Sequence, residues 1–261
     1  NPSLKHMYNF FETYYVPNNM AIFISGDIDI SNTITLIDKH FSVWQSKPLP
    51  AEKTWVEAPL QGVERVEVQY LGEEYVMLAF RTVARGHPDA EALQLVDMVL
   101  DNATAGLINL NLNQRQKVRQ AGSSPPMYND YGYQTLWGIS KQDQTLQEVE
   151  QLLLEQLEMV KKGDFETWII PAIVNDFKKS QKAGLESNGR RVSWMRGTFL
   201  SYEDWDHTIA GLDRMSKLTK DDLVRVANQY FGSDYVAGYR LNGQHEVPQI
   251  EKPPINKIEI D

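Results

Sequence analysis

The sequence contains no cysteine and only five histidines among its 261 residues. The absence of cysteine excludes disulfides, thiolate zinc sites, iron–sulfur clusters and a cysteine nucleophile. It leaves the localisation unknown, because a cysteine-free chain suits a bacterial periplasm and a cytoplasm equally well. No two histidines stand in His-x-x-x-His or His-x-x-Glu-His spacing. A zinc site carried by one helix is therefore also excluded.

Other signatures are missing as well. There is no Gly-rich phosphate loop, no Gly-x-Ser-x-Gly segment and no apolar run long enough to predict a membrane span. Acidic residues outnumber basic residues by 35 to 26, a formal net charge of −9, and such a field repels polyanions. We therefore expect no nucleic-acid partner. The chain starts at Asn1 without a signal peptide, which suggests a processed chain or a piece of a longer one.

The composition is otherwise that of a folded, soluble protein, with 42% hydrophobic and 23% charged residues. Apolar spacing predicts its secondary structure. Helices are expected at residues 2–14, 29–44, 87–100, 107–119, 144–162, 164–185 (kinked at Pro171), 193–206 and 219–231. Strands are expected at residues 20–24, 65–71, 75–81, 127–140 (one or two) and 235–241, with 65–71 and 75–81 forming a pair, and residues 121–126 are expected to form a loop.

This order of elements is not a strict alternation of strand and helix. It predicts an α+β fold, with a mixed, largely antiparallel sheet and helices packed on one face. We find no internal repeat. Residues 1–241 are predicted to form a single lobe, and residues 242–261, with three prolines and little periodicity, a linker or C-terminal tail.

Two polar clusters are candidate sites. His87 and Glu91 are four residues apart and could share a helix face, but first-turn charges explain them better. The run from Glu203 to His207 contains three acids and a histidine, yet adjacent side chains rarely converge on one ion, so solvated charges are the better interpretation. The basic residues between Lys178 and Arg196 are likewise interpreted as a solvated helix surface. Residue chemistry alone thus predicts no catalytic, cofactor-binding or metal-ligating residue.

Residues 11–29 carry a more specific pattern. They read Phe-Glu-Thr-Tyr-Tyr-Val-Pro-Asn-Asn-Met-Ala-Ile-Phe-Ile-Ser-Gly-Asp-Ile-Asp. This stretch resembles the segment that opens the second lobe of zinc metallopeptidases of the insulinase and pitrilysin type. The later stretch Leu-Asp-Asn-Ala-Thr-Ala-Gly-Leu at residues 100–107 is similar to the helix end and small-residue break of the same family.

The resemblance implies four related lobes around a peptide-degrading chamber. The inverted His-x-x-Glu-His zinc motif belongs to the preceding lobe, so no zinc ligand is expected in this chain. Active halves of the family also use an Arg and a Tyr that help to hold the substrate. The matching positions are Asn113 and Ala121 here, and neither role can be carried over.

We therefore predict a non-catalytic lobe of an insulinase/pitrilysin-like zinc metallopeptidase, which helps to form the chamber and is inactive alone. Its expected partners are other lobes of the same polypeptide or a homologous subunit, with peptide as the substrate of the parent protein. The alternative is a catalytically silent scaffold or assembly subunit of the same fold. A third hypothesis, an autonomous peptide-binding module, would require an exposed aromatic groove.

Overall fold

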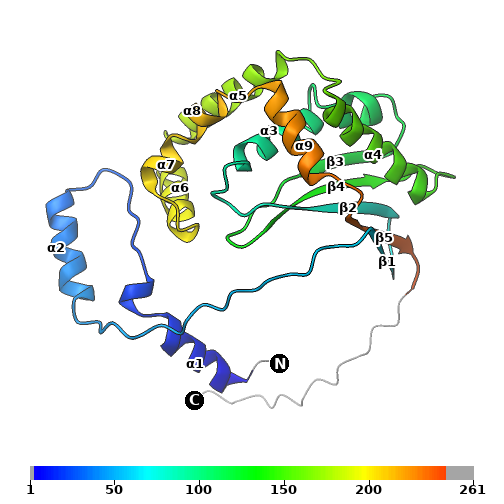
Figure 1. The fold of residues 1–261 in the computed structure, drawn as a ribbon. Helices are drawn as coiled ribbons and strands as arrows, with labels where there is room; N and C mark the ends of the chain where they lie inside the picture. Colours follow the sequence, from blue (N-terminus) through cyan, green and yellow to red (C-terminus); the bar gives the residue numbers. More distant parts are fainter. Residues whose placement is uncertain (1–2, 245–261) are drawn as a thin grey trace, which may run out of the picture.

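The computed structural model describes residues 3–244, which contain one five-stranded sheet covered on one face by helices (Figure 1). The strands are β1 (Val63–Tyr70), β2 (Tyr75–Thr82), β3 (Gln120–Ser124), β4 (Gly132–Ile139) and β5 (Tyr235–Asn242). Their spatial order is β1-β5-β2-β4-β3. β1 runs parallel to β5, and all the other pairs are antiparallel. The predicted α+β fold with a largely antiparallel mixed sheet is confirmed.

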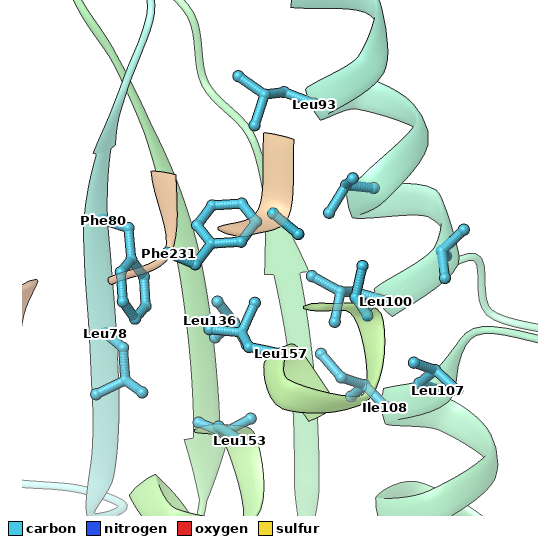
Figure 2. Packing of buried hydrophobic residues seen from close by; sticks show 14 of the residues in the cluster. Leu78, Phe80, Leu93, Leu100, Leu107, Ile108, Leu136, Leu153, Leu157 and Phe231 are labelled. Carbon is cyan, nitrogen blue, oxygen red and sulfur yellow. The ribbon is translucent and has the colours of Figure 1, made fainter. Parts of the chain in front are cut away.

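The core lies between the sheet and the layer formed by α3 (Ala90–Leu100), α4 (Leu146–Lys162) and α9 (Lys220–Tyr230). On β2 the alternate residues Val76, Leu78 and Phe80 are buried, as expected for a strand with one covered face. Figure 2 shows Phe80 beside Phe231, the residue that follows α9, and their ring centroids are 5.6 Å apart. This packing fixes the helical layer on the sheet.

α4 and α9 begin at residues whose side chains cap the helix. Thr145 and Glu148 form a reciprocal capping box at the start of α4, and Gly163 ends it in the left-handed conformation at φ 72°. Thr219 and Asp222 form a second capping box at the start of α9. The structure thus confirms both helices within one or two residues of the predicted bounds.

The remaining helices extend the layer outward. α5 (Ile169–Gly184) and α8 (Gly211–Met215) pack beside α3, and α6 (Asn188–Leu200) and α7 (Trp205–Ile209) continue from them (Figure 1). α1 (Leu4–Tyr14), the short 3-10 helix η1 (Pro17–Asn19) and α2 (Ile30–Phe41) precede the sheet in the chain. In Figure 1, α1 and α2 lie apart from the sheet and its helices.

The predicted pairing of the strands at 65–71 and 75–81 is wrong. Both strands exist, but β5 lies between them, with Val66 opposite Gly238 and Met77 opposite the same glycine from the other side. The short connection around Gly72 suggested a hairpin. Tertiary pairing with a strand about 170 residues later overrides that local signal.

Three further predictions are corrected. Residues 20–24 are extended but are not part of a strand, because no neighbouring strand is present in the described residues. The helix expected at 107–119 shortens to a π-helical turn, η2 (Asn109–Asn113), and the loop expected at 121–126 contains β3 instead. β3 consists of Gln-Ala-Gly-Ser-Ser, which has little intrinsic strand preference and is set by pairing with β4.

Pro171 does not kink a helix. α5 begins at Ile169, so Pro171 is its third residue, where a missing backbone N–H costs no intrahelical hydrogen bond. The helix expected at 193–206 begins earlier, at Asn188, because Ser187 caps it by accepting a hydrogen bond from the Arg190 backbone N–H. It ends at Leu200. None of the described helices is long and apolar enough to cross a membrane. Residues 245–261 of the predicted tail lie outside the described residues.

Candidate functional site

The segment of residues 3–44, here called the N-terminal segment, exposes most of its large apolar side chains. α1 and α2 each have an apolar face, yet no residue of either helix is buried. The exposed apolar side chains of the segment include Leu4, Met7, Phe10, Phe11, Met20, Ile22, Ile24, Ile34, Leu36, Phe41 and Trp44. So many exposed large apolar side chains within about 40 residues are typical of an interaction surface rather than of solvent-facing structure.

Between the two helices, residues 20–24 carry five apolar side chains in a row. From Ala21 to Ile28 the backbone forms no backbone–backbone hydrogen bond within the described residues. Ile22 is 50% exposed and Ile24 is 43% exposed. An extended stretch that is apolar on both faces and has free N–H and C=O groups is suited to the interior of a sheet.

The N-terminal segment touches the rest of the fold at α6. The rings of Phe23 and Phe199 meet edge to face with centroids 5.8 Å apart, and the Ser25 hydroxyl donates to Asn188 Oδ1 at 3.1 Å. Phe199 itself is 44% exposed. These contacts place the extended stretch beside α6 and leave the larger apolar faces of α1 and α2 open.

The edge strand β1 is fixed to the fold by a network of charged and hydroxyl groups. All eight of its residues are exposed, but the Arg65 guanidinium forms a bidentate ion pair with Glu150 of α4, at 2.7 and 3.0 Å. Tyr235 donates to Glu150 at 2.7 Å, and Tyr239 donates to the same carboxylate. Burial by itself would raise the pKa of Glu150, but these donors outweigh it and lower the pKa.

The same network acts on its donors. Burial and the hydrogen bonds to the carboxylate raise the pKa of Tyr235 and of Tyr239 to about 12. The bond to Glu150 raises the pKa of Arg65 above its ordinary value. All three donors keep their protons at neutral pH. The sequence offered no signal for this cluster, because Glu150 is 85 residues from both Arg65 and Tyr235.

The structure separates His87 and Glu91, which the sequence places within one helical turn. α3 begins at Ala90, so His87 lies before the helix, where its Nδ1 accepts from the Asp89 backbone N–H at 3.1 Å. Glu91 forms an ion pair with Arg214 at 2.6 Å. Glu91 therefore occupies the first turn as the sequence predicts, with a specific cation as its partner.

The run from Glu203 to His207 forms a helix start. Asp204 caps α7 by accepting from the backbone N–H groups of Asp206 and His207. Glu203 and His207 line a cavity of about 580 Å³ to which His87 and Glu91 also contribute. Two clusters more than 100 residues apart in sequence thus meet along one cavity. The basic residues Lys178, Lys179, Arg190, Arg191 and Arg196 lie on exposed or half-exposed positions of α5 and α6.

A zinc centre does not fit the described residues. Between residues 3 and 244, no three side chains of His, Asp or Glu come together in a way that could hold a metal ion. A structural or catalytic zinc site needs three or four such ligands. We therefore assign no metal-dependent step to this part of the chain.

Two hydrogen bonds join Asn113 to Ala121. These are the two positions that were compared with the substrate-holding Arg and Tyr. The Asn113 amide donates to the Ala121 carbonyl at 2.9 Å and accepts from the Ala121 N–H at 2.8 Å. This reciprocal pair joins η2 to the start of β3. Asn113 therefore has a structural task in this chain, and a side chain that is committed in this way is not available to a substrate.

Comparison with known proteins decides the family. Residues 3–176, more than half of the chain, match the family described as the Peptidase M16 inactive domain. The chain belongs to this family. It is 27% identical over 240 residues to the zinc protease PqqE of Helicobacter pylori, and this match covers 88% of the chain and 53% of that protein.

Solved structures share the fold of this M16 inactive domain. A protease from Helicobacter pylori superposes with a TM-score of 0.85 at 22% identity, over 92% of the chain and 60% of that structure. The periplasmic protease PqqL from Escherichia coli gives a TM-score of 0.71 at 16% identity, over 93% of the chain and 29% of PqqL. The chain thus spans about half of the length of the curated relative it matches.

Proposed function

We propose that this M16 inactive domain is a supporting lobe that docks, through its N-terminal segment, onto a neighbouring zinc-bearing lobe and helps to enclose peptide substrates. The observation that carries the proposal is the exposed helix, extended stretch and helix of residues 3–44. These residues carry the apolar side chains of a folded interior, and within residues 3–244 no element buries most of them.

The extended stretch supports docking by strand addition. Its free N–H and C=O groups suit the edge of another sheet, while α1 and α2 would cover one face of that sheet. A neighbouring lobe of the same fold class offers such a sheet edge. The chemistry of peptide hydrolysis would then belong to the neighbouring lobe, and this chain would contribute packing and part of the chamber wall.

Substitutions in the extended stretch test the docking. The experiment uses the longest native polypeptide that contains these residues, with zinc content and peptidase activity as readouts. A carboxylate in a buried strand is strongly unfavourable. Ile22→Asp and Ile24→Asp should therefore abolish peptidase activity and lower the zinc content, because the zinc-bearing lobe loses its packing against this chain. Val56→Asp is the matched control, since Val56 is 87% exposed in the connection that follows the N-terminal segment, and it should leave activity unchanged.

Amide exchange reports on the contact directly. The amides of residues 21–24 should exchange rapidly in the isolated chain and should be protected in the longer polypeptide. Rapid exchange in both would contradict docking through this stretch. Protection in a polypeptide that has neither zinc nor peptidase activity would instead establish the alternative function, a catalytically silent scaffold of the same fold.

A further inference from the structure

The cavity of about 580 Å³ lies where the start of α3, the connection from β3 to β4 and the α6 to α8 region meet. One wall comes from residues 85–94, and the facing wall comes from residues 194–215. A volume of this size falls within the range of small-molecule sites. Its residues lie outside the N-terminal segment, so what it binds is a separate question from docking.

Arg85 brings an unneutralised positive charge to the cavity. Its guanidinium donates to the Ser201 hydroxyl at 2.5 Å and to the Met127 carbonyl at 3.2 Å, both uncharged acceptors. It forms no ion pair within residues 3–244. A guanidinium has five N–H donors, and a carboxylate is its preferred planar partner. Arg85 is thus fixed in place with donors left for an incoming anion.

Glu203 brings an unneutralised negative charge to the same cavity from the other wall. Its Oε2 accepts from the Thr208 hydroxyl at 3.2 Å. Its Oε1 lies 3.6 Å from the point that a Cβ on Gly86 would occupy, and so it is close to the backbone beside Arg85. In the described part of the chain Glu203 pairs with no cation. The carboxylate is therefore open to a ligand ammonium group.

The other charges of the cavity neutralise each other. Arg214 donates through Nε and Nη2 to Glu91, at 3.0 and 2.6 Å, and through Nη1 to the His207 carbonyl. This pair closes one side of the cavity without leaving a charge for a ligand. Arg85 and Glu203, unlike Arg214 and Glu91, have no ion-pair partner in the described residues. A ligand that carries both a negative and a positive charge could pair with both.

The rest of the lining combines aromatic and apolar side chains with the polar side chains of Gln94, Gln181 and Thr208. Trp194 is half-buried and packs against Trp205 with ring centroids 5.2 Å apart, and Met127 and Tyr128 also face the cavity. Because His87 Nδ1 accepts from the Asp89 backbone N–H, Nε2 is the ring nitrogen that donates. The walls therefore offer an apolar surface for a side chain and further hydrogen-bond donors.

We propose that this cavity binds a small zwitterion, with its carboxylate on Arg85, its ammonium group on Glu203 and an apolar side chain against Trp194. The shared chemistry is that of a free amino acid and of a dipeptide, the products to be expected where peptides are degraded. The site lies within this chain. It does not depend on the neighbouring lobe, so docking and ligand binding can fail separately.

Calorimetric titration of the full 261-residue chain with phenylalanine and with glycyl-phenylalanine tests the proposal and distinguishes the two sources. We expect saturable binding of at least one, and at least tenfold weaker binding of both its N-acetyl and its amide derivative, because each derivative loses one charge-assisted contact. Equal binding of the zwitterion and its capped derivatives would overturn the proposal. So would the absence of saturable binding of either zwitterion up to about 10 mM.

Two variants test which residue binds the carboxylate and which binds the ammonium group. Each variant is compared with itself across ligands, so a general loss of stability cannot imitate the expected pattern. Arg85→Gln should weaken the zwitterion about tenfold and leave the affinity for the amide at the wild-type value. Glu203→Gln should also weaken the zwitterion about tenfold, and it should leave the affinity for the N-acetyl derivative at the wild-type value. Arg119→Gln, which removes an exposed arginine paired with Glu73 elsewhere on the surface, is the matched control and should change neither. An equal loss for every ligand in both variants would contradict the assignment.

Discussion

Arg65 on the edge strand β1 and Glu150 on α4 form a two-bond ion pair, although 85 residues separate them. The Glu150 side chain is 6% exposed and that of Arg65 is 48% exposed. A nearly buried carboxylate is thus neutralised by a cation that reaches it from the surface. This ion pair connects the edge strand β1 to α4. Protonation of the Glu150 carboxylate would remove the ion pair, so the stability of this edge depends on the charge of Glu150.

Glu150→Gln should lower the free energy of unfolding by about 2 kcal/mol at pH 7, because the half-exposed Arg65 loses its charged partner while hydrogen bonding is partly retained. The pKa of Glu150 is lowered in the folded state. Its contribution is therefore fully present above the unfolded pKa of about 4.3 and is lost as the pH falls through the lower folded value. Urea unfolding at pH 7 and at progressively lower pH measures both effects.

Arg119→Gln serves as the comparison for that prediction. Its partner Glu73 is 48% exposed and Arg119 is 61% exposed, so the loss should stay below about 1 kcal/mol. A difference between wild type and Glu150→Gln that persists unchanged to acid pH would show that the carboxylate charge is not what stabilises β1.

Gly106→Ala should destabilise the fold by at least about 3 kcal/mol. A Cβ at Gly106 would lie 2.7 Å from the Asn102 backbone nitrogen and 2.8 Å from the Leu100 carbonyl oxygen, and backbone atoms cannot move aside cheaply. Gly197→Ala provides the contrast, because a Cβ there meets nothing within 4 Å inside α6. It should raise stability by about 0.5–1 kcal/mol. Thermal unfolding of both variants checks the pair, and similar melting temperatures would contradict it.

Asn113→Ala should lower stability by about 1–2 kcal/mol, since it removes both hydrogen bonds to Ala121 and leaves two backbone groups without their partner. The effect should be local to the start of β3. Hydrogen exchange should accelerate at the Ala121 amide while the amides in the middle of α4 stay protected. Uniform acceleration across the sheet would mean that Asn113 stabilises the whole fold rather than this junction.

The isolated chain should carry zinc only at substoichiometric levels after dialysis against a weak chelator. This follows from the lack of a three-ligand group among residues 3–244. Elemental analysis of the purified chain measures it directly. One tightly bound zinc per chain would contradict the prediction and place a metal site in this domain.

Local signals predicted the fold where they were strong. Apolar spacing with Gly163 predicts the helix at 144–162, and Thr219 with Asp222 predicts the start of the helix at 219–231. α4 and α9 lie within one or two residues of these bounds. The course of β5 could not be predicted in this way. Its position between β1 and β2 is decided by pairing over about 170 residues, and the turn-like Gly72 region favours the wrong neighbour.

The extended stretch and the cavity also depend on long-range packing that the sequence does not reveal. The apolar run at residues 20–24 predicts a strand buried on both faces, but within residues 3–244 it pairs with no strand and Ile22 and Ile24 stay exposed. An apolar run alone does not specify a pairing partner. His87 and Glu203 looked like solvated helix-end charges because each was judged within its own segment. The packing of α8 against α3, with α7 beside α8, brings them to one cavity.

The place of β5 also has a consequence for synthesis. β1 contacts the sheet through β5, and β5 is the last of these five strands to leave the ribosome. Until residue 242 has emerged, β1 has no partner and β2 has one open edge, each exposing N–H and C=O groups to other chains. A nascent chain stopped before residue 235 would therefore lose two strands of five rather than one, and we expect aggregation during translation to be concentrated in this interval.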